Sequence, residues 1–436
     1  MVELYAASIQ SGAVFLPLNT GYTLDELTYF VTDATPKLIV CAQRDAAAMT
    51  QLADAVGAKV LTLNADGTGS LDRERAGQPR TFETCPRASD DLAALLYTSG
   101  TTGRSKGAML THENLLSNAR ALKDTWHITS DDILIHALPI FHTHGLFVAM
   151  NSALLGGVKV RFMPSFDLDA IFDALPASTL MMGVPTFYTR LLSDARLTKD
   201  VVSNIRLFIS GSAPLLAETH DAFANRTGHR ILERYGMTET NMNTSNPYDG
   251  DRRAGTVGKP LQGVEVILTD PNTGNSVPEG EIGMIEIRGP NVFKGYWNMP
   301  EKTAEELRDT GFFISGDLGQ VSSDGYLSIV GRQKDLIITG GYNVYPKEIE
   351  DVLNDIEGVK ESAVYGVVDA DFGEKIIVAV VAENDVALEE TALRDTVSAK
   401  LARFKHPRAY VMMKELPRNT MGKVQKNVLR DTYRPT

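Results

Sequence analysis

Cysteine is scarce in this sequence, with only Cys41 and Cys85 among 436 residues. Two cysteines can form at most one disulfide, and a chain of this length can bury a hydrophobic core without one. Sparse cysteine is typical of proteins from a reducing compartment, so we expect a cytoplasmic protein. The spacings of cysteine and histidine that mark structural zinc sites are missing too, which excludes that class.

Positive charge and long apolar runs are also in short supply. Lys and Arg number 43 against 55 Asp and Glu, a formal charge of −12, and this balance disfavours a nucleic-acid partner. The apolar stretch 145–158 is too short and too interrupted to span a bilayer, so we expect no membrane partner. The first residues lack the basic region of a signal peptide, and Gly12 and Pro17 break their apolar run.

Short β-rich runs alternate with helical patterns over most of the chain, whose length predicts two to three domains. The segment 214–228 predicts a helix that begins at Pro214 and ends at Gly228. Such alternation favours an α/β fold with layered sheets and buried parallel strands. The β-rich runs are 37–43, 93–100, 158–164, 204–213 and 264–270.

The pattern changes near residue 331. A helix over 346–354, β runs over 362–368 and 375–383, a charged helix over 388–401 and a β run over 409–416 follow. Such a unit is the size of a small α+β domain. We therefore expect a large domain over 1–331, a hinge over 332–335 and a small domain over 336–436.

The sharpest motif lies at 96–107, where an apolar strand runs directly into a loop rich in Gly, Ser and Thr. Its glycines let the backbone close around an anion, while amides, hydroxyls and a lysine supply donors and charge. The loop suits a triphosphate, although it lacks the Walker pattern. The alternative is a flexible polar surface turn. The candidate phosphate-binding residues are Thr98, Ser99, Gly100, Thr101, Thr102, Gly103 and Lys106.

The run YTSGTTGRSKG at 97–107 resembles the signature of the adenylate-forming superfamily, which includes acyl-CoA synthetases and luciferases. Ser105 stands where the family usually has Pro. The resemblance extends over 12–430 and implies a large N-terminal domain of layered α/β sheets with a small mobile α+β C-terminal domain. It also implies ATP, Mg²⁺ and coenzyme A. Family members usually carry some tens more residues before this region, so we expect a chain shortened at its N-terminus.

Further motifs occur in family order. The resemblance makes Tyr235 a flat partner for adenine, Glu239 the Mg²⁺ carboxylate together with Thr98, and Asp317 an acceptor for the ribose hydroxyls. It puts Arg332 near ribose or phosphate and Lys334 at the hinge. The remaining residues that it assigns to ATP are Ser212, Ala213, Glu233, Gly236 and Thr238.

The segment 417–424 resembles the C-terminal catalytic loop of the family. Lys423 would reach across the domain gap to the α-phosphate, where an ammonium stabilises developing charge. The resemblance therefore makes Lys423, Glu239 and Thr98 catalytic, with Lys423 also an ATP contact. Coenzyme A would pass the loop that contains Gly340, Gly341 and Tyr342.

Arg234 points to the acid that is activated. Many family members have a small residue at this position, and a guanidinium beside the acyl pocket is costly to bury without an anion. A short dicarboxylic acid would supply that anion, with His142 and Ser212 as further acid contacts. The alternative is that Arg234 pairs with Glu233 or points to solvent. We also interpret the polar run 241–246 as replacing the apolar lining that a fatty chain requires.

The runs 138–149 and 233–248 are similar to the malonyl-CoA synthetases of this family. That similarity implies ligation of malonate or methylmalonate to coenzyme A through an acyl-adenylate, with release of AMP and pyrophosphate. Two alternatives stay open, namely a ligase for another short or aromatic acid and an inactive nucleotide-binding scaffold. The oligomeric state is left open.

Overall fold

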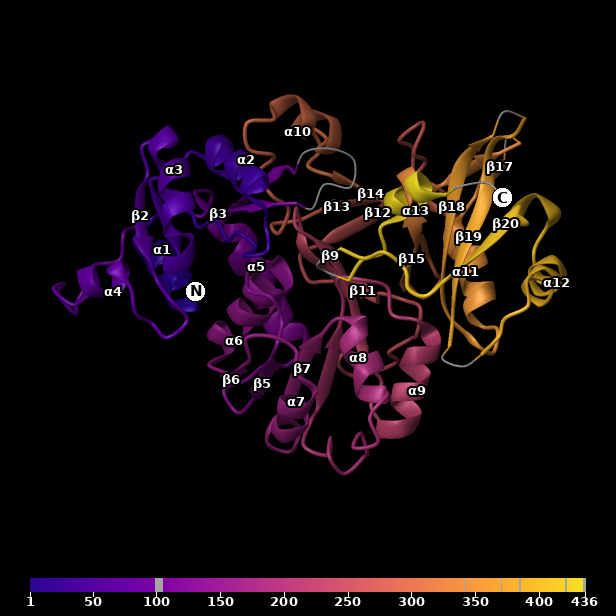
Figure 1. Cartoon of the computed structure of the whole chain (residues 1–436), viewed down its shortest axis with the longest axis horizontal. Coiled ribbons are helices and arrows are strands. Elements are labelled where there is room, and N and C mark those ends of the chain that lie inside the picture. The colour runs from indigo at the N-terminus through magenta and orange to yellow at the C-terminus, as the bar shows by residue number, and fades with distance from the viewer. Residues whose placement is uncertain (99–104, 341, 370, 384–385, 420–421, 434–436) are drawn as a thin grey trace.

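The computed structural model of the chain describes residues 1–98, 105–340, 342–369, 371–383, 386–419 and 422–433. Figure 1 shows a large domain, coloured indigo to salmon, beside a small domain, coloured orange to yellow. Within the described ranges, no helix is both long enough and apolar enough to cross a membrane.

A seven-stranded sheet forms the centre of the large domain, in the order β11-β10-β9-β8-β7-β5-β6. Neighbouring strands from β6 to β9 run parallel, whereas β10 and β11 are antiparallel additions at one edge. β7 and β8 are buried along their whole length, as expected for parallel strands covered on both faces. The bounds are β5 (Ile133–His136), β6 (Lys159–Phe162), β7 (Leu180–Gly183), β8 (Leu207–Ser210), β9 (Leu232–Met237), β10 (Asn241–Ser245) and β11 (Lys259–Pro260).

Helices cover this sheet and bury the largest core cluster against it, including Trp126, Tyr188 and Phe208. The helix predicted to begin at Pro214 begins at Ala217 instead, because Ser212 adopts a left-handed φ of +70° and the chain needs several residues to turn. Its end at Gly228 is confirmed by a left-handed cap. The elements are α5 (His112–Thr125), η2 (His144–Met150), α6 (Asn151–Gly156), α7 (Leu168–Ala174), η3 (Leu175–Ala177), α8 (Pro185–Leu192) and α9 (Ala217–Thr227).

The N-terminal part carries two small sheets, a parallel pair β1-β2 and an antiparallel pair β3-β4. Cys41 and Cys85 are both free. The bounds are α1 (Val2–Gln10), α2 (Leu24–Ala34), β1 (Leu38–Cys41), η1 (Gln43–Asp45), α3 (Ala46–Val56), β2 (Lys59–Thr62), α4 (Ser70–Arg75), β3 (Leu92–Tyr97) and β4 (Gly107–Thr111).

A four-stranded antiparallel sheet completes the large domain, in the order β12-β13-β14-β15. The β run expected over 264–270 is confirmed as a strand, but it belongs to this antiparallel sheet and not to the parallel one. The bounds are β12 (Glu265–Thr269), β13 (Gly283–Arg288), β14 (Phe313–Val321), β15 (Leu327–Arg332) and α10 (Pro300–Glu306).

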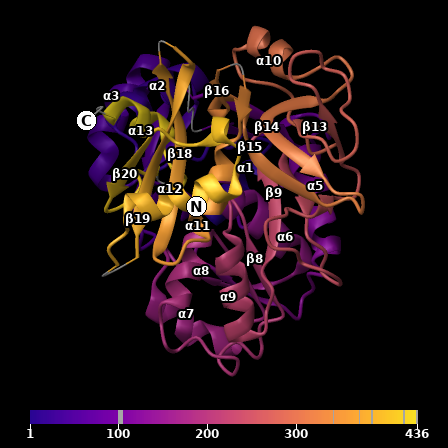
Figure 2. The same cartoon turned by 90° about the vertical axis from the view of Figure 1, so that its right-hand side faces the viewer.

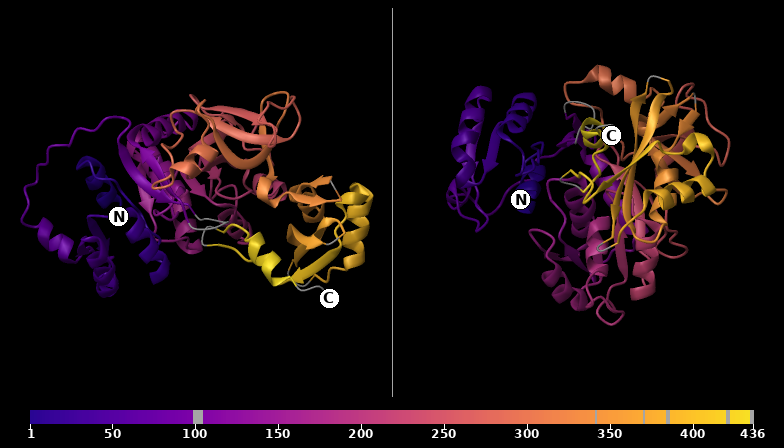
Figure 3. Two further views of the ribbon diagram at one scale, coloured as in Figure 1. Left: turned by 90° about the horizontal axis from the view of Figure 1, so that it is seen from above. Right: turned by 45° about the vertical axis from the view of Figure 1, so that its right-hand side comes forward.

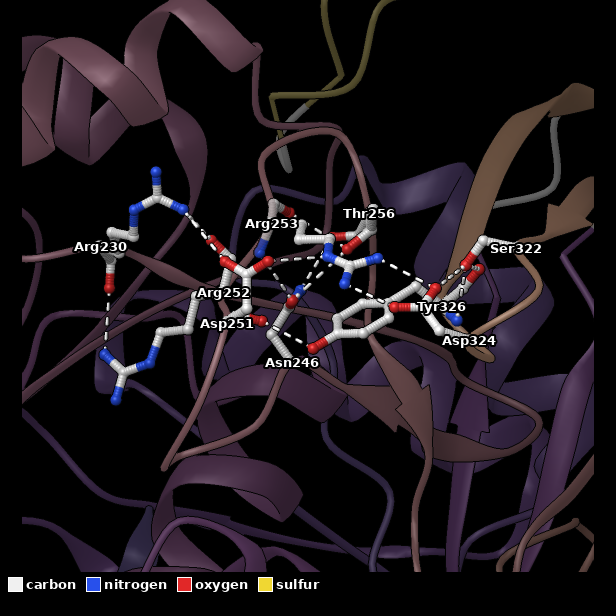
Figure 4. A network of polar contacts seen from close by, with 9 residues as sticks. All are labelled: Arg230, Asn246, Asp251, Arg252, Arg253, Thr256, Ser322, Asp324 and Tyr326. Atoms are coloured by element: carbon white, nitrogen blue, oxygen red, sulfur yellow. Dashed lines mark hydrogen bonds and ion pairs between the residues drawn. The ribbon is translucent and has the colours of Figure 1, made fainter.

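A polar network ties the loop after β10 to the turn between β14 and β15 (Figure 4). Arg253 donates to both carboxylate oxygens of Asp324, and its guanidinium lies 4.0 Å from the centre of the Tyr326 ring. The Tyr326 hydroxyl donates to the Asp251 carbonyl at 2.8 Å. The seven-stranded and four-stranded sheets are therefore joined by several side chains at once.

The small domain follows β15 and the single turn η4 (Gln333–Asp335). Its sheet has the order β17-β16-β19-β18, with β20 parallel to β19, and Figure 2 shows it above α8 and α9. The expected helices and β runs are all found. The bounds are β16 (Ile337–Thr339), β17 (Tyr342–Val344), α11 (Pro346–Asn354), β18 (Val359–Asp369), β19 (Gly373–Ala382), α12 (Glu390–Lys400), η5 (Arg403–Lys405), β20 (Ala409–Met413) and α13 (Lys426–Thr432).

Candidate active site

Three of the residues assigned to the nucleotide meet where the seven-stranded sheet adjoins the four-stranded sheet. The Tyr235 hydroxyl at the end of β9 donates to Asp317 Oδ2 on β14 at 2.6 Å. Arg332 Nε on β15 lies 2.6 Å from Asp317 Oδ1. The charge of Asp317 raises the pKa of Arg332, and burial together with that charge raises the pKa of Tyr235 well above its usual value. These residues form a buried carboxylate with an aromatic ring and a cation beside it.

Glu239 lies in the turn between β9 and β10 and is connected to the phosphate loop by residues that the sequence did not reveal. The Tyr296 hydroxyl lies 2.9 Å from Glu239 Oε1 and 2.6 Å from Glu306 Oε2. Glu306 in turn accepts from Lys106 Nζ at 3.1 Å. Burial raises the pKa of Glu239. The expected metal carboxylate and the loop lysine are thus linked through one tyrosine and one further glutamate.

The phosphate loop is closed at its base and supported by α2. Thr98 N donates to the Lys106 carbonyl at 2.9 Å, while the Tyr29 hydroxyl of α2 donates to the Ser105 carbonyl at 2.8 Å. Asp33 of the same helix accepts from the Tyr97 hydroxyl. The predicted residues Ser99, Gly100, Thr101, Thr102 and Gly103 lie outside the described residues.

The guanidinium of Arg234 is buried and incompletely hydrogen-bonded among the described residues. Its side chain is buried, at 4 % exposure, and Nε and Nη2 have no hydrogen-bond partner among the described residues. Burial lowers its pKa to about 9, so it remains charged at neutral pH. Glu233 turns to the other side of β9, where its carboxylate lies 3.5 Å from His220. The alternative of a pair between Arg234 and Glu233, or of a solvent-facing Arg234, is therefore wrong.

Two histidines, His142 and His144, lie near Arg234. His144 Nδ1 lies 3.1 Å from Ser212 Oγ, and His144 N donates to His142 Nδ1 at 3.3 Å. Burial, followed by the charges of Lys423 and Arg234, lowers the pKa of His142 to about 3. Burial and Arg234 also lower the pKa of His144. Both imidazoles are neutral, so the cations here are Arg234 and Lys423.

The interpretation of the polar run 241–246 as a pocket lining is wrong for its second half. Thr244 donates to the Val257 carbonyl, Ser245 accepts from the Trp126 indole, and Asn246 donates to the Glu233 carbonyl. These side chains satisfy buried groups of the protein itself. Their polarity is explained by the junction of β9, β10 and the following loop.

Lys423 comes from the small domain and lies within electrostatic reach of the residues above. Figure 3 shows the segment before α13 extending from the small domain toward the large one. The backbone N of Lys423 donates to Asn419 Oδ1 at 3.0 Å. Burial between the domains and the charge of Arg332 lower the pKa of Lys423, whereas Asp317 and Glu239 act in the opposite direction. The structure brings Lys423 to the cleft, as predicted.

The remaining predicted residues lie in several places. Ala213 and Thr238 lie in turns beside the cleft, whereas Gly236 lies within β9, where a Cβ would be 1.8 Å from the Asn241 carbonyl oxygen. Lys334 lies in η4, directly after β15. The structure does not bring Gly340 and Tyr342 to the cleft: Figure 1 shows β17 in the outer part of the small domain. Tyr342 stacks there on Phe404, and Gly341 lies outside the described residues.

The fold and this site define an adenylate-forming enzyme, and the comparison with known families agrees. The chain belongs to the AMP-binding enzyme family, whose model matches residues 1–297, while the model of the AMP-binding enzyme C-terminal domain matches residues 348–423. The resemblance found in the sequence is thereby confirmed, as is the pairing of a large N-terminal with a small C-terminal domain.

Individual relatives within this family include ligases that act on different acids. The chain is 36 % identical to a malonate–CoA ligase of Arabidopsis thaliana over 96 % of this chain and 74 % of the relative. It is 35 % identical to a feruloyl-CoA synthase of Amycolatopsis, over 99 % and 86 %. The crystal structure of ATP-bound MatB from Rhodopseudomonas palustris matches with a TM-score of 0.98 and 58 % identity, over 99 % and 86 %. The structure of apo MatB from the same organism matches at 0.86 with the same identity and coverage.

Proposed function

We propose that the protein is an ATP-dependent ligase that joins malonate, or methylmalonate, to coenzyme A through an acyl-adenylate. The products are malonyl-CoA, AMP and pyrophosphate. The observation that carries the choice of acid is Arg234, a buried guanidinium beside neutral histidines, whose Nε and Nη2 have no hydrogen-bond partner in the described part of the chain. The similarity to the malonate–CoA ligase of Arabidopsis thaliana and to MatB from Rhodopseudomonas palustris supports the same choice.

ATP binds across the front of the large domain. Tyr235 stacks on adenine, Asp317 accepts the ribose hydroxyls, and Arg332 neutralises the ribose–phosphate side. The phosphate loop wraps the triphosphate with backbone amides and hydroxyls. The residues that we assign to ATP are Thr98, Ser99, Gly100, Thr101, Thr102, Gly103, Lys106, Ser212, Ala213, Glu233, Tyr235, Gly236, Thr238, Asp317, Arg332 and Lys423.

The residues around Glu239 fit a magnesium ion. Mg²⁺ prefers oxygen ligands and typically takes one or two carboxylates together with phosphate oxygens. Glu239 offers a buried carboxylate whose Oε1 is fixed by Tyr296, and Thr98 offers a hydroxyl at the base of the phosphate loop. When bound, the ion would neutralise phosphate charge.

Arg234 binds the carboxylate of the acid that does not react. A guanidinium receives a carboxylate in bidentate geometry, and that contact restores the partner missing from the free protein. His142 and Ser212 line the same space. A monocarboxylic or aromatic acid would leave the buried charge uncompensated, which costs several kcal/mol.

The reaction has two balanced steps. In the first, a carboxylate oxygen of the acid bonds to the α-phosphorus while the bond to pyrophosphate breaks, and Lys423 stabilises the charge that develops there. In the second, the thiolate of coenzyme A bonds to the acyl carbon, AMP leaves, and the thiol proton goes to solvent. Water exclusion and positioning do most of the work.

Rotation of the small domain separates the two steps. We place the large domain at 1–331, the hinge at 332–335 around Lys334, and the small domain at 336–436. The higher TM-score to ATP-bound than to apo MatB supports an arrangement suited to the first step. Rotation then withdraws Lys423 and brings Gly340, Gly341 and Tyr342 to coenzyme A. The substrates are small molecules, and we propose a cytoplasmic location because both cysteines are free.

A panel of acids tests this proposal. We expect coenzyme-A-dependent AMP formation to be fastest with malonate or methylmalonate, slower with acetate and propionate, and slowest with ferulate. Equal rates with malonate and propionate would contradict the dicarboxylate assignment. Absence of pyrophosphate release from folded protein with ATP and malonate would favour a nucleotide-binding scaffold.

A further inference from the structure

Gly211 stands immediately after β8 and faces the guanidinium of Arg234. A Cβ built on Gly211 would lie 2.3 Å from Arg234 Cζ, 2.4 Å from Nη1 and 2.6 Å from Nε. Carbon atoms that do not bond to each other stay roughly 3.5–4.0 Å apart. The guanidinium therefore fills the volume that the side chain of any other residue at 211 would occupy.

Arg234 lies in the interior of the seven-stranded sheet and is buried. Arg234 lies on β9, opposite Ser245 of β10, and β9 also pairs with β8. Tyr188 is close enough to influence the pKa of Arg234, and Arg234 is close enough to lower the pKa of His144. His144 is itself held by Ser212, the residue after Gly211.

The obstacle at Gly211 differs in kind from that at Gly236. A Cβ at Gly236 would meet backbone, since the Asn241 carbonyl oxygen would be 1.8 Å away. The three heavy atoms nearest to a Cβ at Gly211 all belong to the end of a flexible side chain, and the backbone there is outside the left-handed region. An alanine at 211 is therefore accommodated when the Arg234 side chain moves, so the substitution displaces the guanidinium and leaves the backbone in place.

We propose that Gly211 is a specificity-determining residue: its missing side chain opens the slot in which Arg234 is held for the second carboxylate of the substrate. The proposal rests on the function given above and adds the reason why Arg234 is available there. Gly211 acts through Arg234, so it is a positioning residue that contacts no reacting atom.

The test is the variant Gly211→Ala, assayed with malonate and with propionate. Loss of a well-placed contact to a buried charge costs roughly 2–5 kcal/mol, equivalent to a fall of about 30-fold or more. We expect kcat/KM for malonate to fall by at least about 30-fold, while kcat/KM for propionate falls by less than about threefold. Gly77→Ala is the matched control and should change neither value, because no described residue beyond its two chain neighbours has an atom within 4 Å of a Cβ at that glycine.

A second background separates this effect from general damage. Lysine carries a compact ammonium in place of the planar guanidinium, so Gly211→Ala should have little further effect on malonate turnover when Arg234→Lys is already present. An equal fall with both acids, or the same malonate loss in both backgrounds, would overturn the proposal. If the wild-type protein itself showed no preference for malonate, the proposed function would fail instead, so the two failures are distinguishable.

Discussion

Arg234→Met should make the protein more stable while removing its preference for malonate. Burial lowers the pKa of Arg234 from its ordinary value to about 9, and each pKa unit corresponds to 1.36 kcal/mol, so the charged form costs the folded state about 5 kcal/mol. The pKa is lower in the folded than in the unfolded state. The penalty is therefore fully present below pH 9 and is relieved as the pH rises from 9 toward 12.5.

Methionine keeps most of the side-chain length and removes the charge. We expect the free energy of unfolding at pH 7 to rise by about 1–4 kcal/mol, since part of the gain is lost to imperfect packing. Denaturant unfolding measures this change without ligands. Malonate at saturating ATP should raise the midpoint of the wild type but not that of the variant, and kcat/KM for malonate should fall by about 100-fold or more.

Arg252→Met is the matched control for this experiment. Arg252 donates to the carbonyls of Pro247 and Tyr248, away from the cleft (Figure 4 labels Arg252). Its replacement should lower stability and leave the ratio of malonate to propionate turnover unchanged. The reasoning on Arg234 would be refuted if Arg234→Met lowered the free energy of unfolding and reduced both acids by the same factor.

Three further outcomes are expected. Lys423→Ala should slow malonate-dependent pyrophosphate exchange by about 10²–10³-fold, as for loss of one charge-stabilising donor. The rate of thioester formation from preformed malonyl-adenylate should stay within about threefold of the wild-type rate. An equal loss in both reactions would contradict the role of Lys423. Tyr296→Phe should weaken the apparent affinity for Mg·ATP by about tenfold through loss of a hydrogen bond to a charged group, whereas Tyr326→Phe, which bonds outside the cleft, should not. The ratio of kcat/KM for malonate to that for propionate should fall above about pH 9, because Arg234, with its pKa lowered to about 9 by burial, loses its charge there; a flat ratio up to pH 10 would argue against it.

The local sequence pattern predicted most individual helices and strands, but it did not predict which strands pair with each other. The helix over 346–354 agrees with α11 because Pro346 opens it and its apolar spacing is regular. The strand over 264–270 was found, but nothing in its sequence distinguishes an antiparallel partner from a parallel one. The start of α9 was missed because it depends on the left-handed Ser212, held by His144.

The same division applies to the site. Residues within one contiguous motif, such as Tyr235 and Glu239, could be located from the sequence. Glu306 could not, because it lies 200 residues from Lys106 and carries no local signature. Tyr296 is likewise recognised as a partner of Glu239 only when the sheets are assembled.

The bonds among Tyr235, Asp317 and Arg332 have a consequence for how the two domains move. Arg332 is the last residue of β15 and precedes η4 directly, so the cation bonded to Asp317 adjoins the segment that we propose as the hinge. A nucleotide that competes for Asp317 changes the restraint on Arg332. By reciprocity, whatever orientation of the domains that restraint favours must alter nucleotide affinity by the same factor. Under the proposed function, nucleotide binding and domain orientation are therefore linked in one thermodynamic cycle through the carboxylate of Asp317.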